Sequence, residues 1–317
     1  MVALVIIAIN VVLLSAIEYG VRVYLDHNQI YDIEMSRYAR KLKIASQNPR
    51  IGHEHRPGAS AHLMGVDVSI NRDGLRDRDF ELGPSASHRI IVLGDSLTFG
   101  WGVELQDTFA KRIERSLREI RPVEVLNFGH GNYNTEQEVD LFIDKGLAYE
   151  PDQVVLFFFI NDAEETPMRS GWGFLERSEL VSLFWSRMRV AFSSVVDNTN
   201  FATYYSSLYD EDAPGWLATV RALELLRDTC RDRNIELRVV LLPELHQLAD
   251  YPFRELHGRV LQVLEALGIP ALDLAPLFPT DVDPKIYWVA RDDAHPNATA
   301  QALIAKLTSP FIEQGFR

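Results

Sequence analysis

From residue 89 onward the chain alternates short apolar segments with amphipathic ones, and this alternation constrains the fold more than any other feature. Residues 153–160 (QVVLFFFI) are apolar without interruption, as expected for a strand that helices cover on both faces. The other predicted strands are residues 89–94, 123–128, 236–242 and 271–274. Helices are predicted over residues 106–120, 135–149, 215–233, 253–267 and 297–307. This order predicts an α/β fold with an open, parallel five-stranded sheet.

Polar segments follow the predicted strands, at the edge where an open α/β sheet binds its ligands. They are residues 94–100 (GDSLTFG), 127–135 (NFGHGNYNT), 161–162 (ND) and, before the last helix, 292–297 (DDAHPN). Together they hold a hydroxyl nucleophile, an imidazole base, acids and several amide donors. Those groups are the set that acyl transfer through a serine requires.

Each of these residues also has a purely structural interpretation when it is taken alone. A serine after a strand is more often a helix N-cap, and His295 alone would be a solvated loop histidine. Asp292 and Asp293 would complement the dipole of the last helix. An aspartate three residues before a histidine can, however, hold Nδ1–H and leave Nε2 to accept a serine proton. The coincidence of all these groups at four separate places favours the catalytic interpretation.

The same four segments resemble the blocks of the SGNH hydrolases, also called the GDSL lipase/esterase superfamily. Residues 94–97 are GDSL itself, and residues 127–135 resemble the block whose glycine supplies an oxyanion amide. Residues 161–162 resemble the Gly-x-Asn-Asp block, and residues 292–295 the final Asp-x-x-His block. The resemblance covers about residues 88–310 and implies a three-layer, flavodoxin-like fold.

The resemblance implies a role for each matching residue. Ser96 would be the nucleophile, His295 the general base and Asp292 the carboxylate that orients it. The oxyanion hole would be formed by the backbone amides of Ser96 and Asn132 and by the side chain of Asn161. Further residues expected to line the pocket are Asp95, His130, Gly131, Phe159 and Asp162.

Two positions depart from the pattern of these blocks. Asn132 stands where block two has its glycine, and Phe159 stands at the glycine position of block three. Asparagine tolerates positive φ better than most residues, so an amide donor survives the first change. Neither change removes a catalytic group, so we expect an active enzyme.

The first 25 residues are predicted to form a transmembrane anchor. Residues 1–17 contain no charge, and only Asn10 and Ser15 among them are polar. The alternatives are a buried core helix and a cleaved signal peptide, but no basic segment precedes the run and no small-x-small site follows it. Residues 26–87 are expected to be a polar extension and linker, with a helix near residues 35–45 and a strand at residues 65–70. The hydrolase domain then spans residues 88–317, with a lid-like or substrate-binding insertion at 163–213.

The side of the membrane on which the domain lies is predicted from two opposed arguments. The basic residues that follow the anchor would retain the domain in the cytoplasm; they are Arg22, Arg37, Arg40, Lys41 and Lys43. Resemblance to anchored envelope hydrolases favours the outside. We expect a single-pass membrane protein whose catalytic domain is extracytoplasmic, that is, periplasmic.

Composition excludes several partners. The 45 acidic residues against 32 Lys and Arg give a net charge of −13, which would repel a phosphate backbone, so no nucleic-acid partner is expected. The single Cys230 cannot form an internal disulfide. His53 and His55 have no ligand cluster beside them and are expected in a surface loop, so neither a metal nor a cofactor is predicted.

The leading function predicted from the sequence is an esterase that cleaves acetyl or other short acyl esters on a carbohydrate or lipid of the cell envelope. An O-acyltransferase would use the same acyl-serine chemistry, with a sugar hydroxyl in place of water. The third alternative is an inactive binding or scaffold protein.

Overall fold

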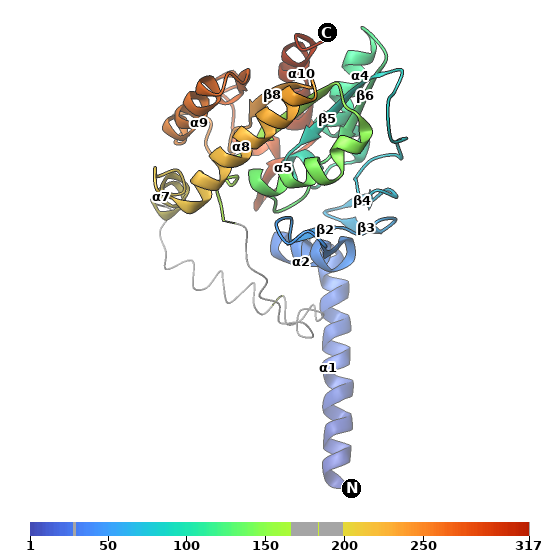
Figure 1. Cartoon of the computed structure of the whole chain (residues 1–317). Coiled ribbons are helices and arrows are strands. Elements are labelled where there is room, and N and C mark those ends of the chain that lie inside the picture. Colours follow the sequence, from blue (N-terminus) through green and yellow to red (C-terminus); the bar gives the residue numbers. More distant parts are fainter. Residues whose placement is uncertain (28–29, 166–182, 184–198, 317) are drawn as a thin grey trace.

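The computed structural model describes residues 1–27, 30–165, 183 and 199–316 of the chain. A folded body carries one long helix that extends away from it (Figure 1). Much of the predicted insertion at 163–213 lies outside the described residues. Its described part includes the helix α7 (Thr199–Ser207).

A parallel five-stranded sheet forms the centre of the body, as the alternation of strands and helices predicts. The strands are β5 (His88–Leu93), β6 (Val123–Asn127), β7 (Gln153–Phe158), β8 (Glu236–Leu241) and β9 (Ala271–Asp273). Their order in the sheet is β6-β5-β7-β8-β9, and every residue of β5 and β7 is buried. The strand order reverses beside β5, so the carboxyl ends of β5 and β7 border the crevice where such sheets bind ligands.

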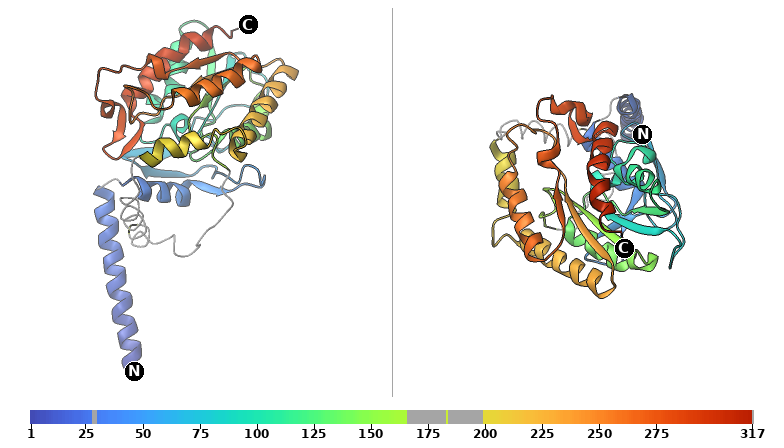
Figure 2. Two further views of the ribbon diagram at one scale, coloured as in Figure 1. Left: turned by 90° about the vertical axis from the view of Figure 1, so that its left-hand side faces the viewer. Right: turned by 90° about the horizontal axis from the view of Figure 1, so that it is seen from above.

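Helices cover both faces of the sheet and complete three layers (Figure 1, Figure 2). Ile90 and Val92 of β5 belong to the core that α4 (Phe109–Arg118) and α10 (Ala298–Glu313) cover. Their neighbours in β5 point to the opposite face, where the core includes residues of the helices α5 (Thr135–Asp144), α8 (Pro214–Asp232) and α9 (Arg254–Ala266). Short helices lie in the connections: α3 (Ser96–Phe99), η1 (Leu105–Asp107), η2 (Gly146–Tyr149), η4 (Ala275–Leu277) and η5 (Pro284–Tyr287).

The segment from residue 26 to residue 87 contains the helix and the strand that the sequence predicts, but it packs on the body instead of forming a linker. It forms α2 (Tyr31–Leu42) and two antiparallel pairs, β1 (Lys43–Ala45) with β2 (His53–His55) and β3 (Ser60–Leu63) with β4 (Val66–Ser69). Its apolar residues form a third core with Phe99 and Trp101, which follow β5. The buried Arg76 donates to the carbonyls of Phe99 (3.1 Å) and Val103 (2.6 Å). This segment is therefore part of the body.

The N-terminal helix α1 (Val2–His27) contains the predicted anchor. Its residues Val5–Tyr24 have a mean hydropathy of 1.8 and none of them is buried, so the helix is long and apolar enough to cross a membrane. The two polar side chains within the first 17 residues are satisfied by the helix itself. Asn10 Nδ2 donates to the carbonyl of Ile6 (2.8 Å), and Ser15 Oγ donates to that of Val11 (2.7 Å).

Candidate active site

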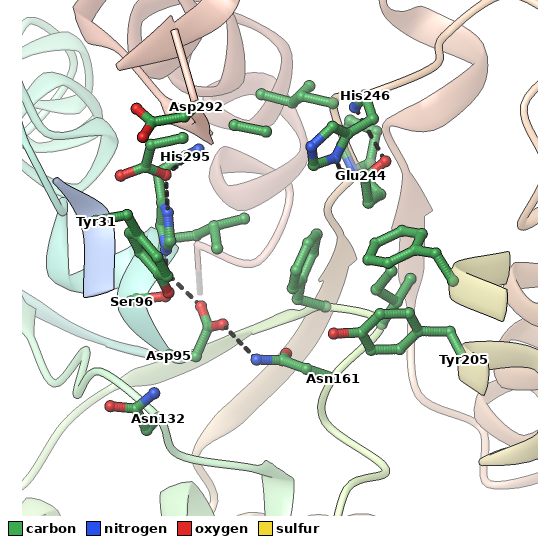
Figure 3. Close-up of a pocket in the computed structure, with 18 residues that line it drawn as sticks. Tyr31, Asp95, Ser96, Asn132, Asn161, Tyr205, Glu244, His246, Asp292 and His295 are labelled. Atoms are coloured by element: carbon green, nitrogen blue, oxygen red, sulfur yellow. Dashed lines mark hydrogen bonds and ion pairs between the residues drawn. The ribbon is translucent and has the colours of Figure 1, made fainter. Parts of the chain in front are cut away.

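Ser96 lies immediately beyond β5, at a turn that only glycine allows. Gly94 has φ +153°, and a Cβ there would lie 2.0 Å from Thr98 Oγ1. Asp95 caps α3 by accepting the amide of Leu97 (2.8 Å). The tight turn leaves the Ser96 side chain facing a cavity of about 280 Å³ (Figure 3).

A hairpin near the C-terminus brings His295 to this serine. The hairpin consists of β10 (Trp288–Ala290) and β11 (Asp293–Pro296). Ser96 Oγ lies 2.8 Å from His295 Nε2, although the two residues are 199 positions apart in the chain. His295 Nδ1 lies 2.5 Å from Asp293 Oδ1. Because a carboxylate only accepts, Nδ1 carries the proton, and Nε2 is left to accept the serine hydroxyl.

The carboxylate that contacts the histidine is therefore Asp293 and not Asp292, which corrects the prediction from the Asp-x-x-His spacing. Residues 293 and 295 are two apart in an extended strand, so their side chains share one face of the hairpin. Asp292 precedes that strand and is exposed at the pocket rim. Asp293 is buried and also accepts the indole N–H of Trp101 (2.9 Å).

The charge on Asp293 is stabilised by the groups that surround it. Burial acts to raise the pKa of this carboxyl, but the bonds from the His295 side chain and backbone and from Trp101 outweigh it, and the pKa is lowered. Asp293 is consequently ionised when His295 becomes a cation during proton transfer.

The predicted oxyanion donors lie around the same cavity. Asn132 and Asn161 both line it together with Ser96. Asn132 has φ +66°, so it adopts the left-handed conformation that asparagine tolerates better than most residues. One N–H of the Asn161 amide donates to Asp95 Oδ2 (3.1 Å), as Figure 3 shows, so its second N–H remains for a ligand.

Asp95 lies directly beneath these donors. Burial raises the pKa of this carboxyl, and the Leu97 amide, His295 and Asn161 act in the opposite direction. Glu138 and Asp162 lie nearby, and burial together with repulsion by neighbouring carboxylates, Asp95 among them, raises the pKa of each of them. Burial thus disfavours the charged form of all three carboxyls, of which Asp95 lines the cavity.

Of the other residues expected to line the pocket, Asp95 and Phe159 do so. His130, Gly131 and Asp162 are not among the lining residues, which corrects those three expectations. The His130 ring is turned inward and stacks on His55, with 3.9 Å between the ring centroids. The Asp162 carboxylate folds back to accept the Phe159 amide (3.0 Å).

Sequence patterns did not predict that the segment of residues 26–87 contributes to the pocket. Tyr31, the first residue of α2, lines the pocket, and its ring lies 5.6 Å from that of His295. Tyr38 and Lys43 contact the loop that ends in Asn132. These contacts join residues about 90 positions apart. The helical spacing of Tyr31, Met35, Tyr38 and Leu42 indicates a packing face in this segment, but it does not identify the loop that the face contacts.

Sequence patterns also did not predict the cavity wall opposite Ser96, although the position of its residues after a strand could have indicated it. Glu244 and His246 follow β8 at its carboxyl end, where the rule that located the other segments applies as well. His246 Nδ1 contacts Glu244, and this bond raises the pKa of His246. Phe201 and Tyr205 of α7 complete this wall (Figure 3).

The described residues contain no group of three or more His, Cys, Asp or Glu side chains that could hold a metal. His55 is not in a surface loop as expected, since it belongs to β2 and is buried. Its Nε2 lies 2.6 Å from Tyr38 Oη and its Nδ1 lies 3.1 Å from the carbonyl of Gly74. Both ring nitrogens therefore have structural partners.

Comparison with known proteins adds to this geometry. The model of the GDSL-like lipase/acylhydrolase family matches residues 92–303, more than half of the chain. The chain belongs to this family. Members of such a family act on ester bonds, so this GDSL-like chain is assigned to the hydrolases of esters in general. No curated protein matches the chain.

Solved structures similar to this GDSL-like chain have low sequence identity to it. A lipase/acylhydrolase from Enterococcus faecalis is 16% identical, with a TM-score of 0.46, over 73% of this chain and 97% of that one. A psychrotrophic esterase from Pseudoalteromonas sp. is 14% identical, with a TM-score of 0.45, over 72% and 98%. A two-domain esterase active on acetylated mannans is 16% identical, with a TM-score of 0.47, over 72% and 49%.

Proposed function

We propose that this protein is a serine esterase that uses Ser96 as nucleophile, His295 as general base and Asp293 as the carboxylate that orients the histidine. The observation that carries the proposal is the continuous chain of contacts from Ser96 Oγ through both nitrogens of His295 to Asp293. Family membership supports ester hydrolysis as the class of reaction.

In the proposed reaction, Ser96 Oγ attacks the ester carbonyl while His295 Nε2 takes its proton. Negative charge then develops on the carbonyl oxygen, where the amides of Ser96 and Asn132 and the free N–H of Asn161 would donate. The C–O bond to the alcohol breaks, and His295 returns the proton to the departing oxygen. Water, deprotonated by His295, cleaves the acyl-serine and restores the enzyme.

The proposed substrate is an acetyl or other short acyl ester on a carbohydrate or lipid of the cell envelope. α1 would anchor the enzyme in the membrane, with the body on the extracytoplasmic, periplasmic side. Support for the anchor comes from the uncharged, unburied run within Val5–Tyr24. Protease added to intact spheroplasts tests the side, since a body that is degraded only after lysis would refute the external placement.

The catalytic proposal is tested with the full-length protein in detergent and p-nitrophenyl acetate. Ser96→Ala and His295→Ala should each lower kcat by at least about 10³-fold, and by similar factors, because members of such a unit act together. A fluorophosphonate probe should label the parent protein and not Ser96→Ala. Near-parental turnover by either folded variant would show that the assignment is wrong.

A further inference from the structure

The loop that carries Asn132 is held from behind by the side chain of Lys43, the first residue of β1. Lys43 Nζ donates to the carbonyl of Gly131 (2.7 Å) and to Asn132 Oδ1 (2.9 Å). The same ammonium lies 4.5 Å above the centre of the Tyr38 ring. The loop is therefore attached to the segment that directly follows the N-terminal helix.

We propose that Lys43 is a positioning residue of the esterase, whose ammonium fixes Asn132 so that its backbone N–H faces the oxyanion. This inference rests on the proposed function, because it assigns a role to the same site. Lys43 is not a lining residue of the cavity, so it acts through Asn132 and not on the substrate.

The backbone conformation of Asn132 makes such a support necessary. A non-glycine residue at φ +66° is held in a conformation that is sparsely populated, and the surrounding structure must maintain it. Among the described residues, Lys43 is the hydrogen-bond partner of the Asn132 carboxamide. Without that bond, the carboxamide could rotate into the cavity that Asn132 lines, and the backbone amide would lose its alignment.

The charge of Lys43 has the sign that an oxyanion requires. Within the described part of the chain no carboxylate forms an ion pair with it, and the titratable groups around it are Tyr38, His53, His55 and His130. Burial lowers the pKa of both His55 and His130, the latter to about 3, and raises that of Tyr38, so these three groups are neutral near pH 7.

Burial also lowers the pKa of Lys43 itself, to about 7. The ammonium is the protonated form, so it is lost as the pH rises through this value. At pH values above the pKa of Lys43, its support of the loop that carries Asn132 should therefore weaken, and kcat should fall. An arginine at the same position stays protonated throughout this range.

The test compares Lys43→Met and Lys43→Arg with the parent protein, using the full chain in detergent and p-nitrophenyl acetate. Lys41→Met is the matched control, because Lys41 is an exposed lysine two positions away. Lys43→Met should lower kcat by about 10- to 100-fold with little change in KM, as a small misplacement of a donor does. Lys43→Arg should restore most of kcat and remove the alkaline fall, and Lys41→Met should match the parent.

The outcomes separate this inference from the function on which it rests. If the parent protein hydrolyses p-nitrophenyl acetate no faster than Ser96→Ala does, the proposed function is wrong and this inference is wrong with it. A Ser96-dependent rate that Lys43→Met leaves unchanged overturns the inference alone. An equal loss in Lys43→Arg and Lys43→Met also overturns it, because a purely structural role predicts equal losses. A fall in kcat at alkaline pH that persists unchanged in Lys43→Arg overturns it as well, because another titrating group would then cause the fall.

Discussion

Replacing Asp293 by asparagine tests the central contact of the site with almost no change in size. The two carboxylate oxygens accept three donors: the side chain and the backbone N–H of His295 on Oδ1, and the indole of Trp101 on Oδ2. Asparagine offers one oxygen and one NH₂ group, so at least one of these donors must face another donor. Either orientation of the amide therefore loses a bond that the carboxylate makes.

The catalytic loss depends on which way the amide turns. If NH₂ faces His295, it stabilises the tautomer with the proton on Nε2, which cannot accept the hydroxyl of Ser96. If NH₂ faces Trp101 instead, the tautomer survives but the charge that stabilises the imidazolium is gone. We expect kcat to fall by about 10³–10⁴-fold, which corresponds to about 4–5.5 kcal/mol of transition-state stabilisation.

The control for this experiment is the neighbouring residue. Asp292→Asn makes the same chemical change at an exposed position that precedes the strand, so kcat should stay within about twofold of the parent. Both variants are assayed with p-nitrophenyl acetate, and thermal unfolding is followed in parallel. The unpaired donor beside residue 293 should cost about 1–3 kcal/mol of stability without unfolding the protein. A large loss in Asp292→Asn with near-parental turnover in Asp293→Asn would refute the assignment and restore the spacing-based one.

Three further changes have defined expected outcomes. Asn161→Ala should lower kcat by about 10²–10³-fold through loss of one oxyanion donor, and a rise in KM alone would mean that the amide binds substrate instead. Tyr38→Phe removes the hydroxyl that accepts the buried amide of Gly131, so urea unfolding should show a loss of about 1–3 kcal/mol, and an unchanged midpoint would contradict the contact. A fragment of residues 26–317 should remain folded and active without membrane retention, whereas 88–317 should aggregate or unfold because it lacks most of the third core; equal solubility and activity of the two would contradict that division.

The central sheet could be predicted from sequence because its signals are local. Continuous apolar runs mark β5 and β7, and the structure differs from the predicted strand ends by at most two residues. The ends of the helices were predicted less accurately than those of the strands. The capping box at the start of α5 is formed by Asn134 and Gln137, although Thr135 and Glu138, one residue later, have the same spacing. Both pairs fit the motif, and only the extended backbone of Asn134 decides between them.

The details of the site depended on contacts that a linear pattern does not contain. Asp292 and Asp293 are both at a plausible spacing from His295, and the choice follows from the strand conformation of the hairpin. The bond from the Gly131 amide to Tyr38 Oη joins residues 93 positions apart. A Cβ at Gly131 would lie 2.7 Å from the Tyr38 ring, so the glycine that precedes Asn132 makes room for α2.

The short distance along the chain between α1 and the pocket limits where this enzyme can work. Six residues separate Tyr24, the end of the apolar run, from Tyr31 in the pocket wall, so the two are at most about 25 Å apart even if the chain is fully extended. If the protein is anchored, the catalytic serine would then reach only substrates within a thin layer of solution next to the bilayer. An ester held in that layer would meet the enzyme by lateral diffusion at an effective concentration set by the tether. An ester free in solution would gain no such advantage, so the length of this connection would favour surface-bound substrates before any contact in the pocket discriminates between them.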